Sequence, residues 1–184
     1  MRNQISVLAL DLGSNLGWCR CVCTLRPVLH VNVVDHGTVY LDTLTTERMR
    51  KEYNEVFDRN RVRMMIYKET IHKLIDLVKF DSFVVEDVFC NPTRVSAFKS
   101  LVRYMEVLED IINIEKHKRL YTVAPTMIKR HIDNYGHSDK SRVQEAVLNQ
   151  PAITMKKSSE ATEHEYDAIA AAWAFVHEYL MTLV

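Results

Sequence analysis

The chain has little of what marks disordered, secreted or membrane proteins. Its 184 residues include only four glycines and four prolines, and 47% are hydrophobic, so we expect a globular chain. No segment reaches the roughly 18 apolar residues that span a membrane. Asp11 interrupts the first apolar run, so the N-terminus lacks a signal-peptide pattern. We therefore expect no membrane attachment, and a protein that stays in the reducing cytoplasm.

Cysteine is also scarce, and net charge is absent. Cys19, Cys21 and Cys23 alternate along an expected strand, while Cys90 stands alone. Zinc sites usually need a second cysteine pair, so we interpret these thiols as small hydrophobic groups in a reduced protein. The formal net charge is zero, which neither favours nor excludes a nucleic-acid partner. Residues 116–142 carry seven basic and two acidic side chains, a local net charge of +5 that would also suit an ordinary solvated surface.

The hydrophobic pattern predicts an α/β fold in one domain, residues 1–184. Strands are expected at residues 5–10, 18–25, 28–41, 82–85 and 120–123. Helices are expected within residues 46–78, 91–118, 125–135, 139–149 and 163–180. This order predicts a mixed five-stranded sheet, three antiparallel strands followed by parallel strands, with helices on its faces.

Local signals predict where several of these elements begin and end. Asn91-Pro92 has the pattern of an N-cap followed by proline at the first helical position. Gly136 is expected to end one helix, and Ser138 to cap the next. Residues 151–159, rich in lysine and serine, are expected to form a loop.

Three acids and one histidine stand at the ends of expected elements. Asp11 and Glu86 each end a buried-looking apolar run, and His164 and Asp167 lie three residues apart at the start of the last helix. Acids beside strand cores are costly unless they are paired or bound to metal. Hard cations such as Mg²⁺ prefer carboxylate oxygens, and two such ions about 3.5–4 Å apart can catalyse phosphodiester cleavage. The pattern therefore predicts a divalent-metal site and phosphoryl-transfer chemistry on a nucleic acid.

Each of these residues also has a plainer interpretation. Asp11 could cap backbone amides of the following turn, Glu86 could pair with a lysine, and His164 could be a surface or satisfied histidine. Within the metal site, His164 could ligate as neutral imidazole or move protons. Glu163 and Glu160 are rival ligands.

Four motifs lie in order along nearly the whole chain: residues 10–14 (LDLGS), 85–89 (VEDVF), 139–144 (DKSRVQ) and 164–170 (HEYDAIA). Together they resemble the RuvC-type Holliday junction resolvases of the RNase H-like superfamily. Ser96, Ala97 and Lys99 follow the second motif at offsets similar to those of the family.

The resemblance implies an RNase H-like nuclease. Members of this family are homodimers that cut two strands of a four-way DNA junction symmetrically, with two Mg²⁺ or Mn²⁺ ions per active site. The location would then be a nucleoid, a viral replication site or an organelle. By position, the metal-binding set would be Asp11, Glu86, His164 and Asp167.

The resemblance also implies roles for three further residues. Lys140 would lie near the scissile phosphate, and Lys129 would be a second basic contact to DNA. Phe89 would stack on bases near the junction centre, an interaction worth about 1–3 kcal/mol per base. Core packing for Phe89, and a solvated helix start for Lys140, are the plainer alternatives.

The chain departs from the family pattern at several places. Leu12 replaces a proline, and the turn that leads to Gly17 is one residue short. Residues 103–105 replace a glycine step in a helix that contributes to dimerisation, and the charged stretch 47–63 has no clear counterpart. These departures indicate a divergent member, of phage, viral or organellar type.

Three alternatives to junction resolution stay open. Residues 11–17 (DLGSNLG) also resemble the first phosphate loop of the actin and sugar-kinase class, although that class needs two lobes. A second alternative is a non-catalytic nucleic-acid-binding scaffold of the same fold. A third keeps the nuclease but changes its substrate to flaps, replication forks or RNA, since such sites grip backbone and shape more than bases.

Overall fold

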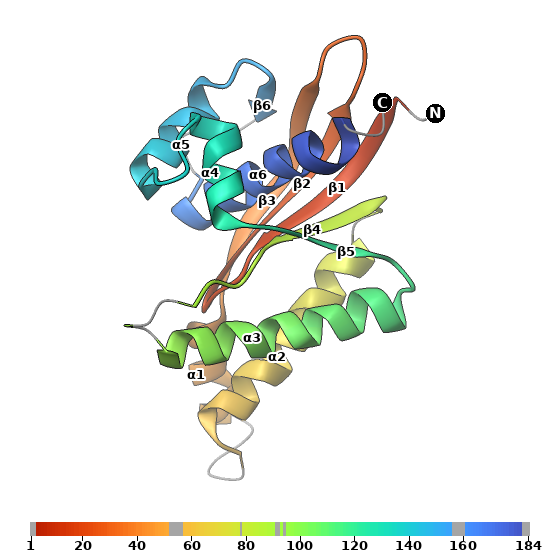
Figure 1. Cartoon of the computed structure of the whole chain (residues 1–184). Coiled ribbons are helices and arrows are strands. Elements are labelled where there is room, and N and C mark those ends of the chain that lie inside the picture. Colours follow the sequence, from red (N-terminus) through yellow and green to blue (C-terminus); the bar gives the residue numbers. More distant parts are fainter. Residues whose placement is uncertain are drawn as a thin grey trace.

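The centre of the molecule is a six-stranded sheet with the strand order β5-β4-β1-β2-β3-β6 (Figure 1). The computed structural model describes residues 3–51, 57–77, 79–90, 93, 95–155 and 161–181. Its strands are β1 Gln4–Asp11, β2 Asn15–Thr24, β3 His30–Tyr40, β4 Ser82–Glu86, β5 Leu120–Val123 and β6 Ile153–Met155. β1, β2 and β3 form the predicted antiparallel meander, and β4, β5 and β6 run parallel to their neighbours. The predicted mixed α/β sheet is thereby confirmed.

One prediction about the sheet is wrong, because it has six strands and not five. β6 lies within residues 151–159, which were expected to form a loop. It pairs in parallel with residues 31–33 of β3, and Ile153 is buried. A segment of three residues shows no readable period, so the open edge of β3, and not local propensity, decides that it becomes a strand.

In the part of the chain that the structure describes, six α-helices cover the sheet, three on each face (Figure 1). Those on one face are α1 Leu41–Lys51, α2 Arg59–Leu77 and α3 Val95–Glu109. Those on the other are α4 Pro125–Asp133, α5 Lys140–Asn149 and α6 Glu163–Phe175. α3 and α6 continue as the π-helical segments η1 Asp110–Glu115 and η3 Val176–Leu180. Within the described part of the chain, no helix is long and apolar enough to cross a bilayer.

The alternation of side chains along the strands divides the core into two layers. In β1, Val7 and Ala9 pack with α4, α5 and α6, whereas Leu8 and Leu10 pack with α1, α2 and α3. The three alternating cysteines of β2 are buried on one face and are free thiols, as predicted: Cys19, Cys21 and Cys23.

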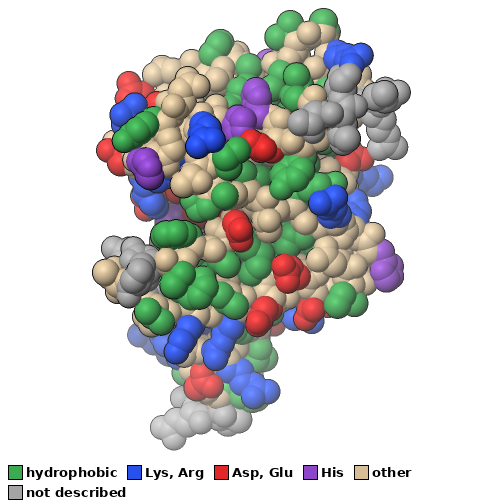
Figure 2. All heavy atoms as spheres, in the orientation of Figure 1, with side chains coloured by type: hydrophobic (Ala, Val, Ile, Leu, Met, Phe, Trp, Pro, Cys, Tyr) green, Lys and Arg blue, Asp and Glu red, His purple; other side chains and the backbone are tan. Residues whose placement is uncertain are grey.

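Apart from residues 57–58, which precede α2, the described part of the charged stretch 47–63 belongs to α1 and α2, which ion pairs hold together. Arg48 Nη1 lies 2.8 Å from both carboxylate oxygens of Glu69, and Arg63 pairs with Asp42. Figure 2 shows basic and acidic side chains interspersed over the lower part of the molecule, where Figure 1 places α1 and α2. This charged region is therefore a pair of docked helices and not a loose extension.

Two predicted helix caps are replaced by neighbouring residues. Asn134, with a left-handed φ of 56°, ends α4 in place of Gly136. Asp139 caps α5 by accepting a hydrogen bond from the Arg142 backbone N–H at 2.9 Å, whereas Ser138 is buried. Asparagine, like glycine, can adopt the left-handed conformation that ends a helix, and aspartate, like serine, can cap a helix start. Local sequence therefore does not separate these choices. The predicted cap at residues 91–92 lies outside the described residues.

Candidate active site

Asp11 and Glu86 leave the sheet side by side. β1 and β4 are parallel neighbours, and Leu10 pairs with Val85 in their register, so the next residue of each strand lies at the same edge. Alternation turns both carboxylates toward the face covered by α4, α5 and α6. Both side chains are half-buried.

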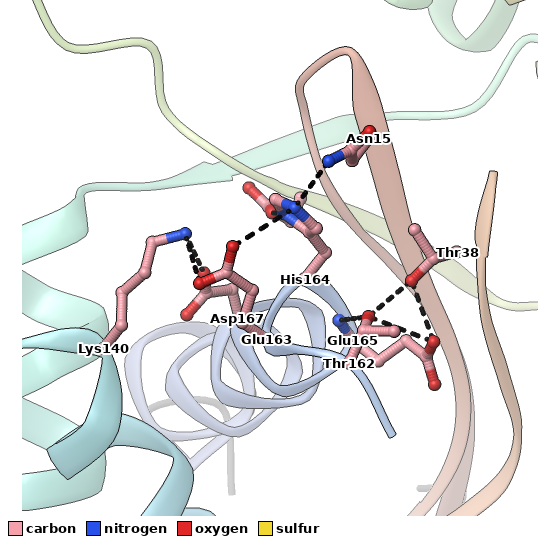
Figure 3. A network of polar contacts seen from close by, with 9 residues as sticks. Asn15, Thr38, Lys140, Thr162, Glu163, His164, Glu165 and Asp167 are labelled. Atoms are coloured by element: carbon pink, nitrogen blue, oxygen red, sulfur yellow. Dashed lines mark hydrogen bonds and ion pairs between the residues drawn. The ribbon is translucent and has the colours of Figure 1, made fainter. Parts of the chain in front are cut away.

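The first turn of α6 brings His164 and Asp167 to this edge of the sheet. His164 Nδ1 lies 2.9 Å from Asp11 Oδ2, and its Nε2 lies 3.2 Å from Asn15 Nδ2. Since an amide nitrogen only donates, Nε2 accepts from Asn15, and Nδ1 carries the proton that Asp11 accepts. The hydrogen bond to Asp11 raises the pKa of His164 above its ordinary value. Figure 3 shows the contact between His164 and Asn15, with Asp167 and Lys140 nearby.

A cleft of about 460 Å³ opens where these elements meet. β1, β4, α4, α5 and α6 all contribute to its walls. Of the residues singled out in the sequence, it is lined by Asp11, Glu86, Phe89, Lys129, Lys140 and Asp167. His164 does not itself line the cleft, but it contacts Asp11, which does.

The carboxylates of the cleft repel one another strongly. Burial, together with the negative charges of Asp11 and Asp167, raises the pKa of Glu86 to about 8. Burial and the charge of Asp11 raise the pKa of Asp167 to about 6. It is therefore costly for all three carboxylates to be ionised at once, and a divalent cation in the cleft would offset that cost.

Two lysines face these acids from α4 and α5. Lys140 Nζ lies 3.3 Å from Glu163 Oε2 and 3.6 Å from Asp167 Oδ2. Burial works against the charge of Lys140, but Asp167 and Glu163 outweigh it and raise the pKa of Lys140 above its ordinary value. Lys129 and Lys140 also act on Glu86 in the direction that lowers its pKa. Both lysines thus place positive charge beside the acids of the cleft.

The positions of Phe89 and Glu163 bear on two alternatives left open by the sequence, core packing for Phe89 and metal ligation by Glu163. The Phe89 ring is 68% exposed and lines the cleft, so it does not pack in the core. Glu163 is exposed and contacts Lys140, and its Oε1 lies 3.5 Å from His164 Nε2. Glu160 lies outside the described residues.

Asn15 and Gly17 contribute to the site without having been singled out as site residues. Asn15 contacts His164 directly, and Gly17 pairs with Asp11 in the register of β1 and β2. The only sequence signal for them is the tight β1–β2 connection, which returns the chain past Asp11. That signal indicates proximity to Asp11 but not a contact with His164, which comes from the other end of the chain.

The donor atoms of the cleft fit a hard divalent cation. Among the described residues, no three Asp, Glu, His or Cys side chains already converge as metal ligands do. Asp11 is instead bonded to His164, and Asp167 faces Lys140. Three carboxylates from three separate elements nevertheless form the oxygen-donor set that Mg²⁺ or Mn²⁺ prefers.

The fold is similar to solved structures of known resolvases. Thermus thermophilus RuvC matches with a TM-score of 0.67 at 15% identity, covering 97% of each chain. T. thermophilus RuvC in complex with Holliday junction substrate matches with a TM-score of 0.66 at 16% identity, covering 97% of this chain and 96% of that one. The yeast mitochondrial Holliday junction resolvase Ydc2 matches with a TM-score of 0.61 at 13% identity, covering 96% and 82%. At these identities the likeness is one of fold.

The sequence itself is related to one family. Over 113 residues it is 34% identical to crossover junction endodeoxyribonuclease RuvC of Finegoldia magna, a match that covers 61% of this chain and 63% of that relative. The family model of crossover junction endodeoxyribonuclease RuvC matches residues 28–177, a segment that holds Glu86, His164 and Asp167 and begins after Asp11. Because the model matches most of its length, this chain belongs to the crossover junction endodeoxyribonuclease RuvC family.

Proposed function

We propose that this chain is a metal-dependent endonuclease that resolves four-way DNA (Holliday) junctions by symmetrical phosphodiester hydrolysis. The observation that carries the proposal is the meeting of Asp11, Glu86, His164 and Asp167 at one edge of the sheet, beside Lys140. Family membership supports it, as does the fold shared with a protein solved in complex with a Holliday junction substrate.

The proposed cofactor is Mg²⁺ or Mn²⁺, two ions per active site. Asp11, Glu86 and Asp167 would hold the ions through carboxylate oxygens. His164 completes the set, either as a ligand or as the group that orients Asp11. When bound, the ions would lower the pKa of a water molecule and neutralise charge on the phosphate. A bond forms between the water oxygen and phosphorus while the bond from phosphorus to O3′ breaks, leaving 5′-phosphate and 3′-hydroxyl ends.

His164 and Lys140 have defined tasks in this chemistry. The Nδ1–H of His164 donates to Asp11 and holds that carboxylate in one orientation. Lys140, a permanent cation 3.6 Å from Asp167, would counter the negative charge that grows on the phosphate during the reaction.

Lys129 and Phe89 would bind the DNA on the two sides of the cleft. The Lys129 ammonium would contact a backbone phosphate, which adds affinity that depends on salt but not on sequence. The exposed Phe89 ring would stack on a base near the junction centre, for about 1–3 kcal/mol.

The proposed assembly on branched DNA is a homodimer. A junction resolved symmetrically is cut in two strands, and one cleft of this kind supplies one cut. Two protomers related by a twofold axis would present two equivalent clefts to a junction that is itself twofold symmetric.

The test is cleavage of a synthetic four-way DNA junction with Mg²⁺ or Mn²⁺, beside linear duplex, flap, replication-fork and RNA–DNA hybrid substrates. Paired symmetrical nicks in the junction are the expected result. Cleavage of flaps, forks or hybrids alone would keep the metal site and assign a different structure-selective nuclease. Tight junction binding with no cleavage of any substrate would instead indicate a non-catalytic nucleic-acid scaffold.

A further inference from the structure

Glu165, on the β3 side of α6, is buried among hydrogen-bond partners and is only 6% exposed. Its Oε1 lies 2.8 Å from Thr38 Oγ1 and 3.1 Å from Thr162 Oγ1, and its Oε2 contacts His36 Nδ1. The two threonine hydroxyls lie 2.5 Å apart. Each has one proton, so one hydroxyl donates to the other and the second donates to Glu165. We call these four residues the Glu165 anchor; Figure 3 shows Thr38, Thr162 and Glu165 together.

The anchor and the candidate active site lie at the two ends of one row across the sheet. Gly17 pairs with Asp11 on one side and with Thr38 on the other, so these three residues lie side by side on β1, β2 and β3. The first turn of α6 crosses this row. His164 bonds Asp11 at one end, Glu165 bonds Thr38 at the other, and Gly17 meets the His164 backbone between them.

We propose that Glu165 is a positioning residue whose anchor to β3 sets where α6 presents His164 and Asp167, and thereby the affinity of the site for its divalent cations. This inference rests on the function proposed above. Glu165 does not itself line the cleft. It acts through the helix, because residues of one helical turn move together when that turn shifts against the sheet.

The body of α6 does not need the anchor to stay in place. Every residue from Ala168 to Phe175 is buried, so apolar packing holds the helix from its second turn onward. In the first turn, by contrast, Glu163 is exposed and His164 is half-buried, and Tyr166 is the one apolar residue that the turn adds to the core. The polar contacts of Glu165 therefore set the position of the first turn, whereas apolar packing keeps the helix attached to the sheet.

The test measures Mn²⁺ binding to DNA-free protein, by electron paramagnetic resonance and calorimetry, for wild type, Glu165→Ala, Glu165→Gln and Thr38→Val. We expect Glu165→Ala to weaken Mn²⁺ binding by about 10–100-fold, the usual loss when a residue that orients metal ligands is removed. Glu165→Gln keeps a carbonyl oxygen that accepts from the threonine hydroxyls, so its loss should be smaller. Thr38→Val removes one hydroxyl at constant shape and should weaken binding in the same direction.

Glu178→Gln is the matched control. Glu178 pairs with His131 Nε2 at 2.5 Å from η3, at the far end of the same helical unit, so the control removes the charge of a second carboxylate that pairs with a histidine. It should bind Mn²⁺ like wild type. In junction cleavage, Glu165→Ala should lower kcat at limiting Mn²⁺, leave KM for the junction unchanged, and recover at high Mn²⁺.

Each outcome decides the matter. Wild-type Mn²⁺ affinity in Glu165→Ala and Thr38→Val, or an equal loss in Glu178→Gln, would overturn the positioning role. If Glu165→Ala does not fold, Glu165→Gln and Thr38→Val decide alone. A wild-type protein that binds Mn²⁺ but leaves the junction uncut would overturn the proposed function while the binding series still judges the anchor. A wild-type protein that binds no Mn²⁺ would overturn both.

Discussion

The backbone of His164 lies directly on Gly17. A Cβ atom at Gly17 would come within 2.1 Å of the His164 carbonyl oxygen and 2.8 Å of its Cβ. Gly17 is paired with Asp11 in the sheet, so the missing side chain lets α6 approach closely enough for His164 to bond Asp11. Close approach, and not an unusual backbone conformation, is what requires glycine at this position.

Gly17→Ala should therefore displace the start of α6. We expect a loss of about 1–3 kcal/mol in the free energy of unfolding, typical of overpacking, and a loss of junction cleavage. Thermal unfolding and cleavage assays measure the two effects. Gly136→Ala is the control, since a Cβ there would meet its nearest atom at 3.5 Å. Wild-type stability and activity in Gly17→Ala would show that the helix does not depend on this contact.

Asp11→Asn should abolish cleavage and leave junction binding largely intact. The asparagine oxygen can still accept from His164 Nδ1, so the variant removes the charge and keeps the contact. Gel-shift binding in Ca²⁺ and cleavage in Mg²⁺ separate the two properties. Asp76→Asn, which changes an exposed acid paired with Lys116 at 3.0 Å, should behave like wild type. Full cleavage by Asp11→Asn would refute the assignment of this residue.

Lys140→Ala should slow cleavage more than it weakens binding. Its ammonium lies beside Asp167, where it would act on charge that develops during the reaction, and such groups lower kcat when they are removed. Single-turnover rates and junction affinity measure the split. Lys116→Ala, which removes a lysine paired with Asp76, is the control. An equal fall in rate and affinity would make Lys140 a simple phosphate contact.

Stability without metal should fall as pH rises through the neutral range. The pKa of Glu86 is about 8 in the folded protein against an ordinary 4.5, and that of Asp167 about 6 against 3.8. Between these values the folded state binds more protons than the unfolded state, so the free energy of unfolding decreases with pH. The raised pKa of His164 acts with the same sign.

Glu86→Gln should flatten this dependence, because it removes the buried charge. At pH 8 without metal, the variant should melt at a higher temperature than wild type and should not cleave DNA. Mg²⁺ at a concentration 100 times Kd should add about 2.7 kcal/mol to the free energy of unfolding of wild type and so raise its melting temperature. The melting temperature of the variant should rise much less. Calorimetric melting from pH 5 to pH 8 tests this, and an unchanged slope in Glu86→Gln would contradict it.

His164→Asp should retain metal-dependent cleavage, whereas His164→Ala should lose most of it. An aspartate at this position replaces the imidazole nitrogen by a carboxylate oxygen beside Asp11 and Asp167, so the set can still hold a divalent cation. A pH–rate profile distinguishes the two roles of His164. If the histidine moves protons, the low-pH limb should change shape in His164→Asp; if it only ligates, the rate should change without a new limb. Cleavage by His164→Ala at the wild-type rate would exclude both roles.

The five longer strands of the sheet, and the acids that end β1 and β4, could be predicted from local sequence. An unbroken apolar run specifies β1 as a strand buried on both faces, and alternation specifies which side chains of β2 are buried. The apolar runs that end at Asp11 and Glu86 specify acids at strand ends, and parallel neighbours bring such ends to one edge. These features were predictable because each depends on residues close together in the chain.

Assembly of the site, by contrast, depends on contacts between distant parts of the chain. The strand β6 exists because β3 offers an open edge, and the contacts of His164 with Asp11 and of Glu165 with Thr38 join residues 153 and 127 positions apart. Both contacts depend on how closely α6 approaches the sheet over Gly17. No local periodicity encodes that approach, because it is set by the packing of one helix against three strands at once.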